Sequence, residues 1–120
     1  MVPRGDGHPH PRPVWGLWRD GRLLLSVGSP TVAAQLRADP TVTVHLGSGT
    51  DVVLVEGRVV GATRDPAALD QYVGKYERPY DVDEHGPLTE VAPERVLAWR
   101  AAGRDGRDGF AAAGRWDLSR

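Results

Sequence analysis

Cysteine is absent from the 120 residues of this chain. Its absence excludes disulfides, thiolate nucleophiles and zinc or iron–sulfur sites with cysteine ligands, and it leaves the cellular compartment unmarked. A long apolar run is missing too, because no stretch approaches the roughly 18 residues that a membrane span requires. The N-terminal residues also lack a hydrophobic signal core. We therefore expect a cytoplasmic protein with no membrane partner.

An excess of charge of one sign is missing as well. The chain has 15 basic and 16 acidic side chains, which give a formal net charge of -1. Such a balance offers no broad basic surface to nucleic acid or to an anionic membrane, although a local basic pocket remains open. A chain of this length is expected to form a single domain over residues 1–120, with roughly two-thirds of its unfolded surface buried.

Two neighbouring stretches in mid-chain are predicted to be strands. Apolar and polar residues alternate in Thr41–Leu46, which is typical of a strand with one buried face. After the turn residues Gly47–Thr50, the stretch Asp51–Val60 is apolar on both faces in its first half. We expect this strand to be covered on both sides, by a barrel interior with a helix outside or by a second subunit, and to bulge at Gly57.

Further strands are expected on either side of this pair. The dipeptide Asp20-Gly21 is a strong hairpin signal, and the hydrophilic repeat Arg104–Gly109 predicts a turn. The strands that these turns join are Val14–Trp18, Arg22–Val27, Val91–Trp99 and Phe110–Leu118. The chain is thus expected to be mainly β and antiparallel, with about six strands in a small barrel.

Two short helices are predicted from their start signals. Ser29-Pro30 begins a helix that runs to about Ala38, and Asp65-Pro66 repeats the same capping pattern. The first helix is expected to bury Val32, Ala33 and Leu36, and the second to present one apolar stripe of Leu69, Tyr72, Val73 and Tyr76. The polar stretch Arg78–Glu90 is interpreted as a loop or lid.

Several side chains have both a structural and a functional interpretation. His8 and His10 are expected in an ordinary loop and His45 in a structural or interface role, while Trp18 is expected in the core. Both interpretations stay open for the cations Arg12 and Arg115, as surface charges or anion contacts. They stay open also for Trp15, Trp99 and Trp116, as core residues or walls of a groove. The polar cluster Asp81, Asp83, Glu84 and His85 is interpreted as a solvated loop, since its spacing fits no calcium loop.

A set of motifs follows one another along nearly the whole chain. They are Asp6–Gly16, the Asp20-Gly21 hairpin leading into Leu25–Gly28, Asp39–Leu46, Asp51–Gly57, Arg95–Trp99 and Gly114–Trp116. In order and spacing these motifs resemble the pyridoxamine 5'-phosphate oxidase-like proteins. The resemblance implies a six-stranded antiparallel split β-barrel that forms a homodimer.

The resemblance also implies a function. Family members hold FMN or the deazaflavin coenzyme of actinobacteria in grooves at the dimer interface, and they are flavoprotein oxidoreductases that act on small molecules. By position, the implied cofactor-binding residues are Arg12, Val14, Trp15, Ser26, Val27, Gly28, Thr31 and Val32, with Trp99, Arg115 and Trp116 reaching across from the partner subunit.

The chain departs from the family pattern at two places. The family's phosphate-gripping segment carries three cations, whereas Pro30–Ala34 carries none. The chain also begins where family members already have a helix and a strand, so the start is misplaced or the dimer or another chain fills that edge. The enzyme therefore has two rivals: a module that binds a different planar ligand without turnover, and a structural subunit that keeps only the dimer scaffold.

Overall fold

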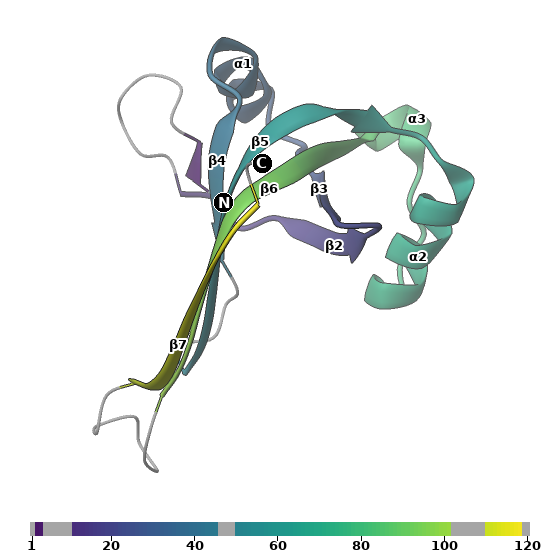
Figure 1. Ribbon diagram of the computed structural model, residues 1–120. Coiled ribbons are helices and arrows are strands. Elements are labelled where there is room, and N and C mark those ends of the chain that lie inside the picture. Colours follow the sequence, from purple (N-terminus) through teal and green to yellow (C-terminus); the bar gives the residue numbers. More distant parts are fainter. Residues whose placement is uncertain (1, 4–10, 46–49, 102–109, 119–120) are drawn as a thin grey trace.

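The computed structural model describes residues 2–3, 11–45, 50–101 and 110–118. Within these ranges, seven strands form one antiparallel sheet, and three helices lie beside it (Figure 1). The strands are β1 (Val2–Pro3), β2 (Trp15–Arg19), β3 (Arg22–Ser26), β4 (Thr41–His45), β5 (Asp51–Thr63), β6 (Leu88–Ala101) and β7 (Phe110–Asp117). The helices are α1 (Pro30–Ala38), α2 (Pro66–Tyr76) and α3 (Val82–His85). The prediction of a mainly β, antiparallel fold is confirmed.

The sheet divides along β6. The strand order is β1-β4-β5-β6-β3-β2, and β7 also pairs with β6. One edge of β6 pairs with β5. Its other edge pairs with β3 near the start of β6, at Thr89–Val91, and with β7 farther along, at Arg95–Ala101. Figure 1 shows the long strands β5, β6 and β7 projecting together with the end of β4, away from α2 and α3. Because no pairing joins the two end strands of this order, β1 and β2, among the described residues, the sheet is not closed.

Local signals in the sequence produce the turns and caps that were expected. Asp20 and Gly21 have φ angles of 50° and 76°, the left-handed conformation that a two-residue hairpin turn requires. Ser29 caps α1 by accepting a hydrogen bond from the Val32 N–H, and Asp65 caps α2 in the same way through the Ala67 N–H. The register of β5 and β6 shifts at Gly57, which confirms the predicted bulge.

The stretch Arg78–Glu90 is more regular than the predicted loop. It contains α3, whose N-cap Asp81 accepts hydrogen bonds from the N–H groups of Asp83 and Glu84, and β6 already begins at Leu88. The acidic cluster therefore caps the start of a helix. The prediction of two short helices was one too low for the described residues, which form three. None of the helices in the described ranges is both long and apolar enough to cross a membrane.

Some expected features lie outside the described residues. They are His8, His10, the turn at Gly47–Gly49 and the turn at Arg104–Gly109.

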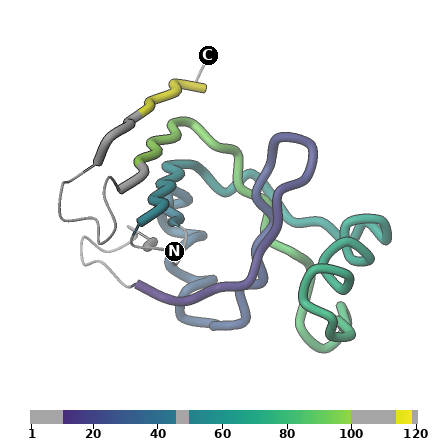
Figure 2. The backbone as a smooth tube through the Cα atoms, turned by 90° about the horizontal axis from the view of Figure 1, so that it is seen from below, coloured from purple at the N-terminus to yellow at the C-terminus, as the bar shows by residue number. Residues whose placement is uncertain are grey.

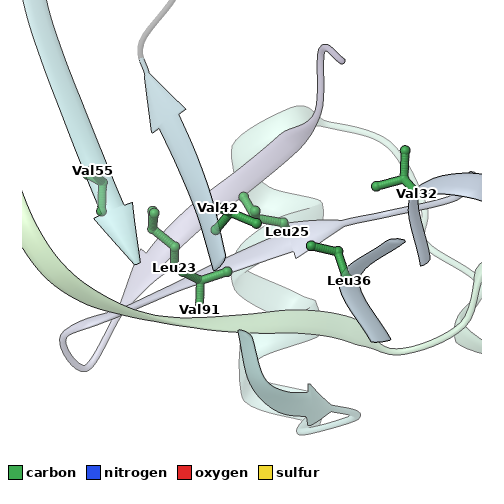
Figure 3. Close-up of a cluster of buried hydrophobic side chains, with 7 residues drawn as sticks. All are labelled: Leu23, Leu25, Val32, Leu36, Val42, Val55 and Val91. Atoms are coloured by element: carbon green, nitrogen blue, oxygen red, sulfur yellow. The ribbon is translucent and has the colours of Figure 1, made fainter. Parts of the chain in front are cut away.

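The core of the described part of the chain consists of two clusters on opposite faces of the β2–β3 hairpin. The first joins β3 to α1, β4, β5 and β6 through Leu23, Leu25, Val32, Leu36, Val42, Val55 and Val91 (Figure 3). The second joins the hairpin to α2 through Leu17, Leu24, Ala68, Tyr72 and Leu88. Since Leu23, Leu24 and Leu25 are only 7%, 3% and 2% exposed, β3 is the strand that is covered on both faces.

The predicted double cover of β5 is only partly present in the single chain. Val53 and Val55 face the first core cluster, and Val55 is buried. Val52 and Leu54 point to the other face, where they are half-buried opposite Trp99 and Leu97 of β6. These four side chains belong to neither core cluster. We call them the outer ribbon face.

Candidate functional site: an aromatic pocket beside the β2–β3 hairpin

The hairpin brings predicted site residues from two strands together. Trp15 of β2 lies opposite Ser26 of β3, so the two side chains project from the same face. Together with Val14 they line a pocket of about 430 Å³. The other lining residues are Pro13, Tyr72, Arg78, Pro79, Tyr80 and His85. We call this space the aromatic pocket. Tyr72 belongs to α2 and His85 to α3, and Arg78, Pro79 and Tyr80 lie between these helices. Figure 2 shows both helices on the outer side of the hairpin.

Trp15 forms a flat platform at the mouth of this pocket. Its ring stacks on Tyr76 of α2 at a centroid distance of 4.7 Å and an interplanar angle of 9°. The Arg78 guanidinium lies 5.7 Å from the centre of the same indole. Trp15 is nevertheless 46% exposed. An indole that is held in place but still open to solvent can stack on a planar ligand without having to be ordered first.

Tyr72 lies at the inner end of the pocket. It is 4% exposed, and its ring contacts those of Tyr76 and Tyr80 at centroid distances of 4.8 and 4.9 Å. Burial raises the pKa of the Tyr72 phenol. This effect is larger than the opposing effect of the hydrogen bond to Ser26, which lowers the pKa. The phenol is therefore neutral at ordinary pH, so it brings a hydroxyl and no charge to the pocket.

Helix α2 holds the outer edge of β2. The Tyr76 hydroxyl donates to the Gly16 carbonyl and accepts from the Gly16 N–H, both at 2.7 Å. The Lys75 ammonium donates to the same carbonyl at 2.5 Å, and the Gln71 side-chain amide donates to the Trp18 carbonyl at 3.0 Å. An edge strand normally leaves such groups unpaired. The contacts to α2 satisfy them and fix Trp15, the neighbour of Gly16.

A second space lies between β2 and the end of β4. It has a volume of about 520 Å³, and we call it the seam cavity because it separates two strands that do not pair. Its apolar residues include Val14, Leu17, Leu23, Leu25 and Val44, and its polar ones include Arg12, His45 and Lys75. Arg12 thus contributes to this cavity and not to the lining of the aromatic pocket. Trp18 also lines the seam cavity and is 47% exposed, so its predicted core position is wrong.

The predicted phosphate segment is only partly accessible. Gly28 and Thr31 are exposed, and Val27 is half-buried against the first core cluster. Val32 is 2% exposed inside that cluster, and its N–H is bonded to the Ser29 hydroxyl. In the single chain, neither the side chain nor the N–H of Val32 is therefore available to a ligand.

The remaining predicted residues lie on the long strands. Trp99 belongs to the outer ribbon face, and Arg115 lies diagonally opposite it on the same face of the sheet. Trp116 projects from the other face, is 53% exposed and folds over Gly114, where an added Cβ would come within 2.5 Å of its ring. None of the three lines the aromatic pocket or the seam cavity.

Sequence reasoning missed part of the aromatic pocket. Tyr72 and Tyr76 were expected only as an apolar stripe, but their hydroxyls bond to the β2–β3 hairpin. Arg78, Tyr80 and His85 were placed in a polar loop. The available signal was the density of aromatic and basic residues between Tyr72 and His85, which is high for a surface loop.

No protein-family model matches this chain, and no curated protein matches it either. Among the described residues, no group of three or more histidine, cysteine, aspartate or glutamate side chains could hold a metal ion.

Proposed function

We propose that the protein is a flavin- or deazaflavin-binding oxidoreductase of the pyridoxamine 5'-phosphate oxidase-like type that acts on a small molecule. The observation that carries this proposal is the half-exposed Trp15 ring, held flat against Tyr76 beside Ser26 and Arg78. A fixed aromatic platform with a few polar groups around it suits a planar heterocycle. The sequence motifs that resemble the family supply the choice of coenzyme.

The aromatic pocket fits the ring of such a coenzyme better than its phosphate. A flavin or deazaflavin supplies the hydride-transfer chemistry when bound, and the protein supplies position and electrostatics. Trp15 would stack on a planar group, Ser26 would offer a hydroxyl, and Arg78 would attract an anionic substituent. On the phosphate side, the first turn of α1 offers exposed Thr31 and no cation. We therefore expect weaker binding of a phosphorylated flavin than the family pattern implies.

A homodimeric split barrel is part of the same proposal. The open sheet and the outer ribbon face leave apolar surface of Val52, Leu54, Leu97 and Trp99 outside both core clusters. A second subunit packed there would cover this surface. It would also allow Trp99 and Arg115 to approach a groove of the partner, as the family resemblance implies.

Titration with FMN and with the deazaflavin coenzyme tests the proposal. Calorimetry should detect binding of one of them to the purified protein, and Trp15→Ala should weaken it at least about fivefold, because base–aromatic stacking contributes roughly 1–3 kcal/mol. Trp18→Ala is the matched control, since Trp18 lies on the same strand and is 47% exposed but does not line the pocket. Absence of binding by either coenzyme would exclude the oxidoreductase.

The phosphate side can be tested by restoring one cation. Thr31→Arg places a guanidinium at an exposed position of the first turn of α1. It should raise FMN affinity about tenfold, as expected for a charge-assisted contact of about 1.5 kcal/mol. Ala38→Arg adds the same charge at the other end of the helix and should have little effect. An equal gain in both variants would show that the phosphate does not bind at this turn.

A non-catalytic module is the second candidate. The observation that favours it is the burial of Val32. At a position where the family pattern has a cation, this chain has an apolar core residue. In that case the aromatic pocket would hold a different planar ligand without turnover. Purified protein that carries a bound chromophore other than a flavin or deazaflavin would support this alternative.

A further inference from the structure

The seam cavity has a basic rim and an apolar floor. Arg12, His45 and Lys75 are all exposed at its edge, while Leu23 and Leu25 of the first core cluster are buried beneath. Arg12 and His45 each also make a contact within the chain, and the Lys75 ammonium donates to the Gly16 carbonyl, so a ligand would share these groups. The three rim groups come from the segment before β2, from the end of β4 and from α2, so the tertiary structure alone brings them together.

The shape of the floor depends on Gly16. A Cβ at this position would come within 2.5 Å of the Leu25 side chain and within 2.8 Å of the Leu24 carbonyl oxygen. The absence of a side chain lets Leu25 lie across β2. Gly16 is also the residue that Lys75 and Tyr76 hold through its backbone, so the floor and one of the rim cations are fixed by the same contacts.

From this arrangement we infer that the seam cavity binds an amphipathic carboxylic acid, with its carboxylate at the basic rim and its apolar tail against Val14, Val44, Leu23 and Leu25. The charge complementarity selects an anion. The apolar floor selects a ligand with one charged end and an apolar body, and a volume of about 520 Å³ is within the range of small-molecule sites. Of the described residues, Pro13 and Val14 line both the proposed site and the aromatic pocket, and the proposed site requires no flavin.

Calorimetric titration of the full chain with decanoate tests the inference. Each methylene added between hexanoate and decanoate should increase affinity up to about fourfold, since burial of one CH₂ contributes roughly 0.8 kcal/mol. Decanol, which has the same tail without the charge, should bind more weakly. Affinity that is independent of chain length, or decanoate that binds no better than decanol, would overturn the proposal.

Rim variants locate the carboxylate. Arg12→Gln and Lys75→Gln should each weaken decanoate binding by up to about fivefold, as expected for partly solvated charge pairs. Arg37→Gln removes an exposed cation from α1, outside the cavity lining, and should leave binding unchanged. Circular dichroism should show that all three variants are folded. An equal loss in the Arg37 variant would place the anion elsewhere and contradict the inference.

The alternative occupants give different outcomes. If a second copy of the chain fills the cavity, decanoate should fail to bind at concentrations where sedimentation shows a dimer, which would overturn the proposal. Thr31→Arg is expected to change flavin affinity and to leave decanoate affinity as it was. The inferred acid site and the proposed flavin site can therefore fail independently of each other.

Discussion

Gly57 lies at the bulge of β5, where the neighbouring strand β6 approaches closely. A Cβ there would come within 2.6 Å of the Ala92 carbonyl oxygen and 2.9 Å of a Val91 methyl group. Gly57→Ala should therefore lower the free energy of unfolding by about 1–3 kcal/mol, measured by urea denaturation. Gly61→Ala is the control in the same strand, since nothing lies within 4 Å of its Cβ position. Equal effects of the two substitutions would contradict this account of the bulge.

Single residues also show how burial limits inference from a motif. Thr31 and Val32 are neighbours in the segment that resembles the family's phosphate grip, yet one is exposed and the other is in the core. Helical periodicity alone predicted the burial of Val32, whereas the family resemblance implied that the same residue contacts the cofactor. The packing of α1 against β3 and β4 agrees with the periodicity.

At the scale of elements, α2 is attached to β2 through side chains that bond to the strand's backbone. Tyr76→Phe removes the hydroxyl that pairs with both the N–H and the carbonyl of Gly16. It should reduce the free energy of unfolding by about 1–2 kcal/mol, because these partly buried groups lose their partner. Hydrogen exchange of the Gly16 amide should become faster, since the edge of β2 opens more readily.

The matched control for this element is Tyr80→Phe. It also removes a phenol hydroxyl, one that donates to the Gly86 carbonyl at 2.8 Å, far from β2 in sequence. Exchange of the Gly16 amide should stay at its original rate in this variant. If both variants accelerate that amide equally, the edge of β2 is protected by α2 as a whole and not by the Tyr76 hydroxyl.

For the whole molecule, the outer ribbon face provides the test of assembly. Leu54→Lys places a charge among half-buried apolar side chains of β5 and β6, and burial of an unpaired charge in an interface is strongly unfavourable. We expect the variant to sediment as a monomer where the original chain is a dimer. Val60→Lys, at a β5 position that is 49% exposed, should leave the dimer intact. A monomeric original chain would remove the basis for the proposed homodimer.

Local sequence by itself determined the elements that depend on near neighbours. The Asp20-Gly21 turn, the Ser29 and Asp65 caps with their prolines, and the Gly57 bulge all follow from backbone conformations and short-range hydrogen bonds. The apolar stripe of α2 and the alternation in β4 likewise follow from the periods of helix and strand.

Only the tertiary structure decided which strand is covered on both faces and which side chains meet. The apolar run in β5 pointed to that strand, but β3 lies between the two core clusters because α1 and α2 pack on opposite sides of the hairpin. In the same way, Trp15 and Tyr76 are 61 positions apart and stack only because α2 crosses the edge of β2. Contacts between residues so far apart in sequence depend on how the elements dock. The pattern of residues within each element does not specify that docking.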